Sequence, residues 1–173
     1  MHILMCNDDG ILADGLRQLA TYLSQYYRIT VVAPATEQSA KSHALTTEIP
    51  LKLDAYNGED ENPRLYALTG TPSDCMKFGL SYLLTDDMPD LVISGINHGF
   101  NLGSDVLYSG TVSAAMESAF YGIPGLALSV ERYSIERGHE MHPFIHELIE
   151  KIYDDGYDDG YKDGVKMCAI IFS

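Results

Sequence analysis

The sequence predicts an α/β fold built on a mostly parallel sheet, and two observations lead to it. Short apolar runs rich in β-branched residues alternate along the chain with longer segments whose apolar residues recur at helical spacing. Alternation of this kind favours parallel strands joined by crossing helices. The 173 residues suit one domain and no linker divides them, so we expect a single α/β domain over residues 1–173.

The first half of the chain contains three strand-like runs and one helix. Residues 3–6 form a short apolar run that predicts a buried strand, and residues 16–26 follow with helical spacing. Residues 29–34 are a β-branched run that ends in proline, which predicts the second strand. The alternating residues 44–53 are typical of a hairpin arm, and residues 64–68 predict another short strand.

The second half continues the alternation of helices and strands. Residues 73–84 predict a helix, because Thr71 or Ser73 can cap its start and Pro72 suits the first helical position. Residues 90–95 predict a strand that enters a glycine-rich loop. The remaining predicted elements are helices at 113–121 and 143–153, a strand at 126–130 and a last apolar run at 165–172.

The charge and hydropathy of the chain argue against nucleic acid and membranes as partners. A formal net charge of −14 argues against binding to duplex nucleic acid, which needs a basic face for its phosphates. No apolar run approaches the length of a membrane span, and the N-terminus lacks the basic region of a signal peptide. We therefore expect a cytoplasmic protein with no membrane association. The widely spaced Cys6, Cys75 and Cys168 are typical of reduced core thiols.

Three polar loops follow predicted strands, and right-handed crossovers would bring them to one edge of the sheet. The first is Asn-Asp-Asp-Gly at 7–10, the second spans 37–43, and the third spans 94–103 and continues to 111. Adjacent buried carboxylates cost free energy unless a cation or hydrogen-bond donors offset them. This favours a metal site, although on this segment alone Asp8 or Asp9 could equally cap the following helix.

The side chains on these loops also suit a phosphate ester. Carboxylates, a hydroxyl and carboxamides form an all-oxygen set, which suits Mg²⁺ or Mn²⁺ better than zinc. Ser109, Gly110 and Thr111 open a helix whose backbone N–H groups can hold an anion. Taken singly, Ser39 is typical of a turn and Asn97 of a left-handed backbone position. The order of the loops after successive strands therefore carries the hypothesis of a cation beside a phosphate, as phosphate-ester hydrolysis requires.

Six sequence blocks occur in a specific order over roughly residues 1–130. They are N-D-D-G at 7–10, V-V-A-P at 31–34, Q-S-A-K-S-H-A-L-T at 38–46, G-T-P-S-D-C at 70–75, P-D-L-V-I-S-G-I-N-H-G-F-N-L-G at 89–103 and V-L-Y-S-G-T-V-S-A-A-M-E at 106–117. In this order they closely resemble the SurE (survival protein E) family of metal-dependent nucleotidases. The resemblance implies a Rossmann-like three-layer sandwich that hydrolyses nucleoside 5′- or 3′-monophosphates to nucleoside and phosphate.

The resemblance also implies one divalent metal ion, Mg²⁺ or Mn²⁺, and a set of site residues. The metal ligands would be Asp8, Asp9, Ser39 and Asn97. The phosphate pocket would be lined by Asn7, Gly95, Asn101, Ser109, Gly110 and Thr111. We expect Asp8 to orient or deprotonate the attacking water and Asn97 to stabilise the developing charge, which makes these two the catalytic residues.

Family members usually continue for several tens of residues beyond the last residue of this chain. The family's assembly into homodimers or tetramers is expected to depend on that segment, which includes a helix exchanged between subunits. The leading hypothesis is an active nucleotidase, because every implied ligand precedes residue 112. The alternative is a truncated, catalytically impaired homologue that still binds metal and nucleotide.

Overall fold

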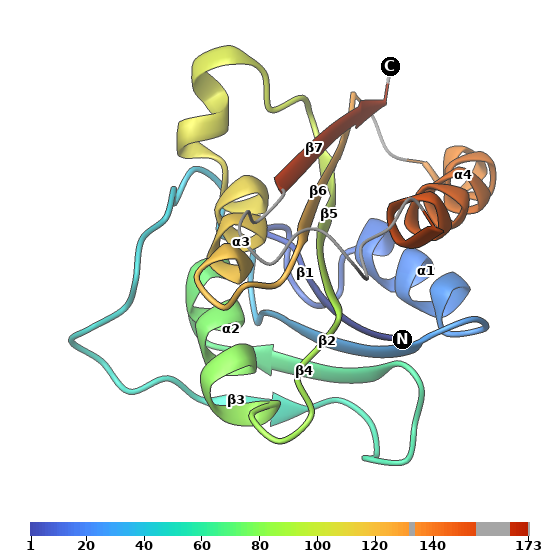
Figure 1. Cartoon of the computed structure of the whole chain (residues 1–173). Helices are drawn as coiled ribbons and strands as arrows, with labels where there is room; N and C mark the ends of the chain where they lie inside the picture. The colour runs from blue at the N-terminus through green and yellow to red at the C-terminus, as the bar shows by residue number, and fades with distance from the viewer. Residues whose placement is uncertain (132–133, 155–166, 173) are drawn as a thin grey trace.

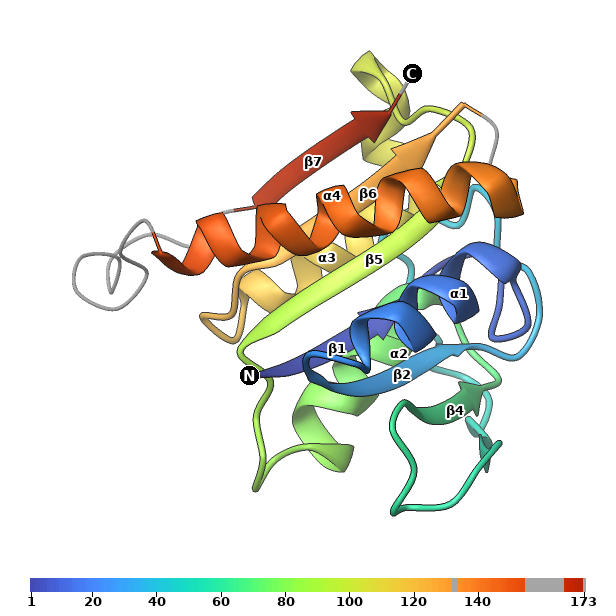
Figure 2. The same ribbon diagram turned by 90° about the vertical axis from the view of Figure 1, so that its right-hand side faces the viewer.

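A seven-stranded sheet runs through the computed structural model, which describes residues 1–131, 134–154 and 167–172. Helices α1 and α4 lie against one face of the sheet, and α2 and α3 lie against the other (Figures 1 and 2). The strands are β1 (His2–Cys6), β2 (Arg28–Pro34), β3 (Leu53–Ala55), β4 (Arg64–Leu68), β5 (Leu91–His98), β6 (Gly125–Val130) and β7 (Met167–Phe172). The helices are α1 (Asp14–Leu23), α2 (Pro72–Phe78), η1 (Gly79–Leu83), η2 (Gly103–Tyr108), α3 (Gly110–Ala119) and α4 (Ile135–Asp154). The predicted three-layer α/β fold is confirmed.

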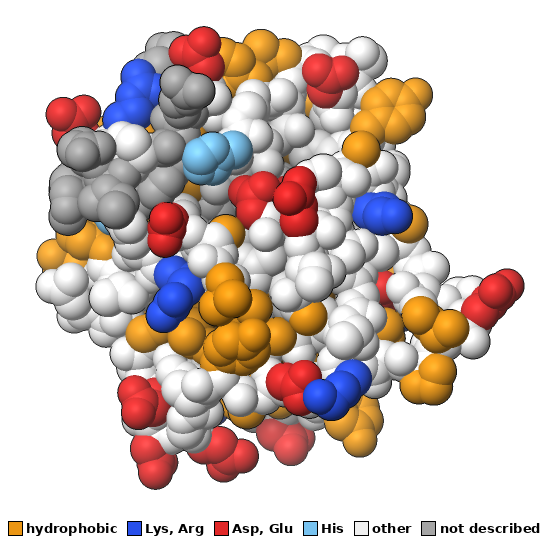
Figure 3. Space-filling model, turned by 180° about the vertical axis from the view of Figure 1, so that it is seen from behind, with side chains coloured by type: hydrophobic (Ala, Val, Ile, Leu, Met, Phe, Trp, Pro, Cys, Tyr) orange, Lys and Arg blue, Asp and Glu red, His pale blue; other side chains and the backbone are white. Residues whose placement is uncertain are grey.

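Strand order determines where a ligand can bind. The order across the sheet is β3-β4-β2-β1-β5-β6-β7, and each neighbouring pair is parallel except β3 with β4. The chain moves outward from β1 through β2 to β4, and then crosses to the other side of β1 to form β5. Open α/β sheets bind ligands where the order reverses, at the carboxyl ends of the strands. That point lies between β1 and β5, and the view in Figure 3 looks onto the face where the parallel strands end.

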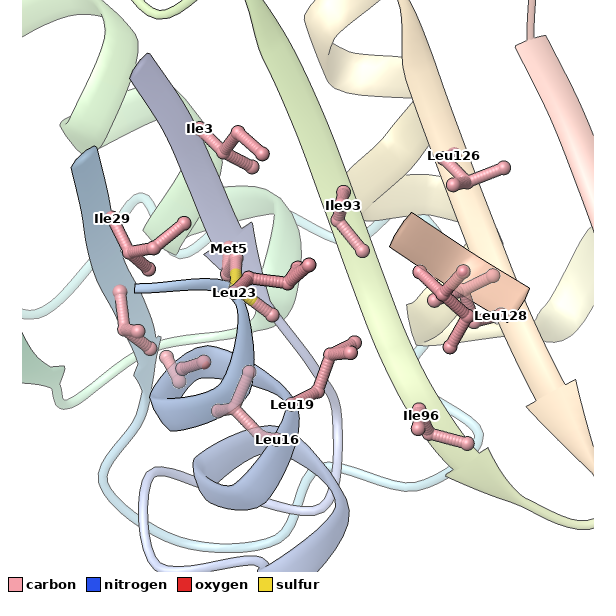
Figure 4. Packing of buried hydrophobic residues seen from close by; sticks show 14 of the residues in the cluster. Ile3, Met5, Leu16, Leu19, Leu23, Ile29, Ile93, Ile96, Leu126 and Leu128 are labelled. Carbon is pink, nitrogen blue, oxygen red and sulfur yellow. The ribbon is translucent and has the colours of Figure 1, made fainter. Parts of the chain in front are cut away.

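The central strand β1 is buried on both faces, as a parallel strand between two helical layers must be. Its side chains alternate between the layers. Ile3 and Met5 pack on the side of α1 and α4, whereas Leu4 and Cys6 pack on the side of α2. Figure 4 shows Ile3 and Met5 in the cluster that also contains Leu16, Leu19 and Leu23 of α1.

Helix α4 is longer than predicted. It begins at Ile135 rather than at residue 143, and Pro143 lies inside it rather than in its first turn. Met141, Ile145 and Ile149 are buried at intervals of four residues, a stripe that continues across the proline. Packing of this stripe against the sheet outweighs the backbone hydrogen bond that proline cannot donate.

The predicted hairpin arm at 44–53 was wrong in its extent. Residues 44–52 contain no regular element, and only Leu53 enters β3, which pairs antiparallel with β4. The arm is instead attached to Asp74 of α2, whose carboxylate accepts hydrogen bonds from the backbone N–H (2.9 Å) and hydroxyl (2.7 Å) of Thr46. The start of α2 was predicted correctly, with Thr71 as the cap and Pro72 in the first turn.

Asp74→Ala is expected to lower the free energy of unfolding by about 2 kcal/mol at pH 7, because Asp74 completes the capping box of α2 and holds the arm. Burial alone would raise the pKa of Asp74, but hydrogen bonds from Thr46 and Thr71 lower it. A carboxyl with a lowered pKa contributes stability above its ordinary pKa and loses it as the pH falls through the folded-state value. Urea unfolding should therefore show a smaller deficit in strong acid, and an equal deficit at both pH values would contradict this account.

The remaining predictions concern thiols and location. Cys6 and Cys75 are buried and free, as predicted. In the part of the chain that the structure describes, no helix is both long and apolar enough to cross a membrane. The cytoplasmic location and the assembly into homodimers or tetramers stay predictions.

Candidate active site at the ends of β1 and β5

The loops that follow β1 and β5 meet where the strand order reverses. On this face, acidic side chains lie next to one another near the centre, with a histidine beside them (Figure 3). The start of α3 also reaches this point, because the hydroxyl of Thr111 donates a hydrogen bond of 2.6 Å to Oδ1 of Asp8. Loops far apart in the sequence therefore converge at the edge that the sequence predicted.

The first loop is shaped by Asn7 and Gly10. The carboxamide of Asn7 donates to the carbonyl of Gly10 and accepts from its N–H, each over 3.1 Å, and the Asn7 side chain is fully buried. Gly10 has a φ of +100°, a conformation that L side chains rarely adopt. Asn7 therefore holds the tight turn that presents Asp8 and Asp9.

Asp8 is held against the first turn of α3. A Cβ added to Gly110 would lie 2.9 Å from Cβ and 3.1 Å from Oδ2 of Asp8, so only glycine permits this approach. Burial raises the pKa of Asp8, while the hydrogen bond from Thr111 lowers it in part. Burial therefore disfavours the negative charge of Asp8, whereas the positive end of α3 beside it favours that charge.

Asp9 is the more exposed of the pair, but one of its oxygens is not. Its Oδ2 is buried and has no hydrogen-bond partner among the described residues. Burial and the neighbouring charge of Asp8 raise the pKa of Asp9, and His98 opposes this shift. A buried carboxylate oxygen without a donor favours a positively charged ligand at that position.

The end of β5 brings Asn97 to the same edge. Asn97 is buried, and its Nδ2 donates to the carbonyl of Gly99 over 2.8 Å, so its oxygen is the atom suited to a cation. Gly95 has a φ of +124°, and a Cβ there would lie 2.3 Å from the carbonyl oxygen of Leu128 in β6. Nδ2 of Asn101 donates to the hydroxyl of Ser129, also in β6, over 2.8 Å.

The start of α3 resembles an anion site. Ser109 caps the helix by accepting a hydrogen bond from the N–H of Val112 over 3.2 Å. The first N–H groups of a helix have no partner within it and carry the positive end of the dipole. Gly110 and Thr111 supply such groups directly beside Asp8.

The second predicted loop, at 37–43, belongs to a segment of residues 36–43 that we call the strap. The N–H of Gln38 donates to the carbonyl of Asp8 over 2.7 Å, so the strap is joined to the acidic turn. Ser42 anchors its far end through hydrogen bonds to the carbonyls of Leu107 and Tyr108. Ser39 is exposed on the strap, and its hydroxyl donates to Glu37 over 2.6 Å.

These donors fit a hard divalent cation. The unpartnered Oδ2 of Asp9 lies beside Asp8, the hydroxyl of Ser39 lies on the strap, and the carboxamide of Asn97 lies at the end of β5. Among the described residues, no three His, Cys, Asp or Glu side chains are arranged to hold a metal ion. The atoms named above that could bind a cation are all oxygens, which suits Mg²⁺ because this ion prefers oxygen ligands and usually keeps several waters.

Comparison with known protein families adds a second line of information. The model of the family described as Survival protein SurE matches residues 3–169 of this chain. The chain belongs to the SurE family. The resemblance inferred from the motifs is thus confirmed.

Individual SurE relatives agree with this assignment. The chain is 55% identical over 129 residues to the 5′-nucleotidase SurE of Thermoanaerobacter sp. (strain X514), an alignment that covers 75% of this chain and 50% of that protein. It is 49% identical over 144 residues to the 5′-nucleotidase SurE of Caldanaerobacter subterraneus subsp. tengcongensis, with 83% and 56% covered. The chain thus spans about half the length of the curated relatives it matches.

A solved structure agrees with the SurE fold. The SurE protein from Aquifex aeolicus superposes with a TM-score of 0.82 at 36% sequence identity, and the match covers 99% of this chain and 66% of that one. The Rossmann-like fold expected from the resemblance is therefore confirmed.

Sequence reasoning placed the loop at 37–43 at this edge of the sheet but assigned no role to Glu37 or His43. Glu37 directly precedes Gln38, whose N–H donates to the carbonyl of Asp8 over 2.7 Å, and this backbone hydrogen bond places Glu37 near the acid pair. Nε2 of His43 contacts Oε2 of the buried Glu117 over 2.6 Å and ties the strap to α3. The topology predicted that these loops converge, but no spacing in the sequence indicates that His43 pairs with Glu117.

Asp9→Asn is expected to raise the Tm of metal-free protein at pH 7, because it removes a charge that burial disfavours. A carboxyl with a raised pKa adds stability below its ordinary pKa, and that stability is lost as the pH rises toward the folded-state value. Mn²⁺ should raise the Tm of the parent chain but not of the variant. Thermal unfolding in chelator and in Mn²⁺ measures both effects, and a lower Tm of the variant in chelator would contradict the argument.

Proposed function

We propose that this chain is a metal-dependent phosphomonoesterase that hydrolyses nucleoside 5′- and 3′-monophosphates to nucleoside and phosphate. The observation that carries the proposal is the buried, unpartnered Oδ2 of Asp9 beside Asp8 at the N-terminus of α3. A cation position and an anion position are then adjacent, as phosphate-ester hydrolysis requires. The names of the relatives, 5′-nucleotidase SurE, support the nucleoside part of the substrate.

We assign the site residues in two groups. The proposed ligands of one Mg²⁺ or Mn²⁺ ion are Asp8, Asp9, Ser39 and Asn97. The proposed phosphate pocket comprises Asn7, Gly95, Asn101, Ser109, Gly110 and Thr111. Within the pocket, Asn7 and Gly95 contribute through the shape of the backbone, because the Asn7 carboxamide is bonded to Gly10 and Gly95 in β5 lies against Leu128.

In the proposed mechanism, water attacks the phosphorus atom while the bond between phosphorus and the ester oxygen of the nucleoside breaks, and that oxygen takes up a proton from solvent. A divalent cation, when bound, supplies Lewis acidity that polarises the phosphate and lowers the pKa of water. Asp8 accepts the proton of the attacking water, and the hydrogen bond from Thr111 to Oδ1 fixes the orientation of its carboxylate. The N–H groups at the start of α3 and the carboxamide of Asn97 stabilise the negative charge that develops on the phosphate oxygens.

The experiment is a measurement of phosphate release from a panel of nucleoside 5′- and 3′-monophosphates with Mn²⁺, Mg²⁺ or chelator. Release that requires the metal and that differs between nucleotides supports the proposal. Mn²⁺ binding without any release favours the other candidate, a chain that binds metal and nucleotide without turnover. Release that is equal in chelator would overturn the metal-dependent mechanism.

A further inference from the structure

A third carboxylate, Glu37, lies on the strap next to the proposed metal ligands. The Ser39 hydroxyl donates to Oε1 of Glu37 over 2.6 Å. The next residue, Gln38, donates its N–H to the carbonyl of Asp8 over 2.7 Å, so the Glu37 carboxylate lies on a segment that is bonded to the acidic turn. Glu37 itself is exposed and belongs to none of the ligand groups assigned above.

The strap is fixed at both ends, which gives the pair of side chains a defined place. Between Glu37 and Ser39, the N–H of Gln38 is bonded to the carbonyl of Asp8 over 2.7 Å. Beyond Ser39, the chain turns through Ala40 and Ser42, whose φ angles of 57° and 54° are left-handed. The hydrogen bonds of Ser42 to Leu107 and Tyr108 then attach the strap to η2.

The direction of the Ser39 proton matters for cation binding. A serine hydroxyl has one proton and two lone pairs, and only a lone pair can bind a cation. When Glu37 accepts the proton, the lone pairs are directed away from Glu37 and become available to a cation. Groups that orient metal ligands in this way typically change metal affinity by about 10- to 100-fold.

We propose that Glu37 is a positioning residue that accepts the Ser39 proton and so orients the Ser39 oxygen toward the divalent cation held by Asp8 and Asp9. This inference rests on the metal site of the proposed function and deepens it. Glu37 acts through Ser39 rather than as a ligand. A general electrostatic attraction between its charge and the cation is a different explanation, and suitable substitutions separate the two.

The test is Mn²⁺ binding by isothermal titration calorimetry to the full chain without nucleotide. Glu37→Ala should weaken binding by about 10-fold or more, and Ser39→Ala should weaken it by a similar factor. Glu37→Gln loses the charge but keeps an oxygen acceptor, so it should retain most of the affinity. The double variant Glu37→Ala, Ser39→Ala should bind no more weakly than the weaker single variant, because both changes remove the same interaction.

Controls separate positioning from folding and from charge. The metal-free Tm of Glu37→Ala should equal that of the parent, since Glu37 is exposed. Glu48→Ala removes another exposed carboxylate further along the chain and should leave Mn²⁺ affinity unchanged.

Four results would overturn the positioning role: parent affinity in Glu37→Ala, equal losses in Glu37→Gln and Glu37→Ala, additive losses in the double variant, or no Mn²⁺ binding by the parent chain. The proposed function can fail separately. If the parent binds Mn²⁺ with the expected pattern among the variants but releases no phosphate, the nucleotidase proposal fails and the role of Glu37 stands.

Discussion

Asp8→Asn is expected to lower metal-dependent phosphate release by at least about 1,000-fold, a loss of about 4 kcal/mol of transition-state stabilisation. The substitution removes the carboxylate proposed to bind the cation and to accept the proton of the attacking water. It should leave the fold intact, because the Asn oxygen can still accept the hydrogen bond from Thr111 that Asp8 accepts now. Phosphate release from nucleoside monophosphates in Mn²⁺ measures the effect.

The matched control is Asp86→Asn. Asp86 is exposed, and its neighbour Asp87 contacts His2 at the beginning of β1, so this acidic pair lies at the opposite edge of the sheet. The control should retain full activity and Mn²⁺ affinity. A loss of less than about 10-fold in Asp8→Asn, with an unchanged Tm, would remove Asp8 from the catalytic machinery.

Burial of the carboxylates of Asp8 and Asp9 has a cost in stability, which the surrounding structure must offset. Burial raises the pKa of Asp8 and of Asp9, so the isolated protein disfavours the charges that it positions. The tight turn at Asn7 and Gly10 and the close approach of Gly110 maintain that arrangement at a cost in stability. A cation would relieve the cost, which is why metal binding and stability should be linked in this chain.

Site residues could be predicted where strand and helix patterns in the sequence fix their position in the fold. The carboxyl ends of β1 and β5 were predictable, because the alternation of strands and helices places Asp8 and Asn97 at one edge of the sheet. Ser109, Gly110 and Thr111 were predicted to open a helix, and α3 begins at Gly110, three residues before the start at 113 that the helical spacing predicted. The loop of Glu37 was also predicted to reach this edge, but a role for Glu37 was not, since no periodicity or spacing distinguishes an exposed acid in a polar loop from a solvated side chain.

The two errors in the predicted fold, at the start of α4 and in the arm at 44–53, arose because contacts between distant segments decided the local structure. Proline was a sound indicator of a helix start for α2, where Pro72 occupies the first turn, but not for α4, where Pro143 lies inside the helix. Local preference decided the first case, and packing of Ile145 and Ile149 decided the second. Alternation in residues 44–53 similarly suggested strand pairing, whereas hydrogen bonds from Thr46 to Asp74 hold the arm without it.

Gly95→Ala is expected to lower the free energy of unfolding by about 3 kcal/mol or more, because two costs add at this position. The φ of +124° is strained for any L side chain, which typically costs about 1–3 kcal/mol. In addition, the new Cβ would lie 2.3 Å from the carbonyl oxygen of Leu128, so β5 and β6 must separate at the irregularity between Ser94 and Asn97. Urea unfolding of the metal-free chain measures the loss.

Gly99→Ala isolates the first of these costs. Gly99 follows β5 directly and has a φ of +95°, but a Cβ there would meet none of the described atoms within 4 Å. It should therefore lose only the cost of backbone strain, and the difference between the two variants measures the clash with β6. If the two variants lose equal stability, the close approach of Gly95 to Leu128 contributes nothing. If Gly95→Ala instead keeps the stability of Gly99→Ala but loses Mn²⁺ affinity, the shift caused by the new Cβ is absorbed at the end of β5, where Asn97 lies.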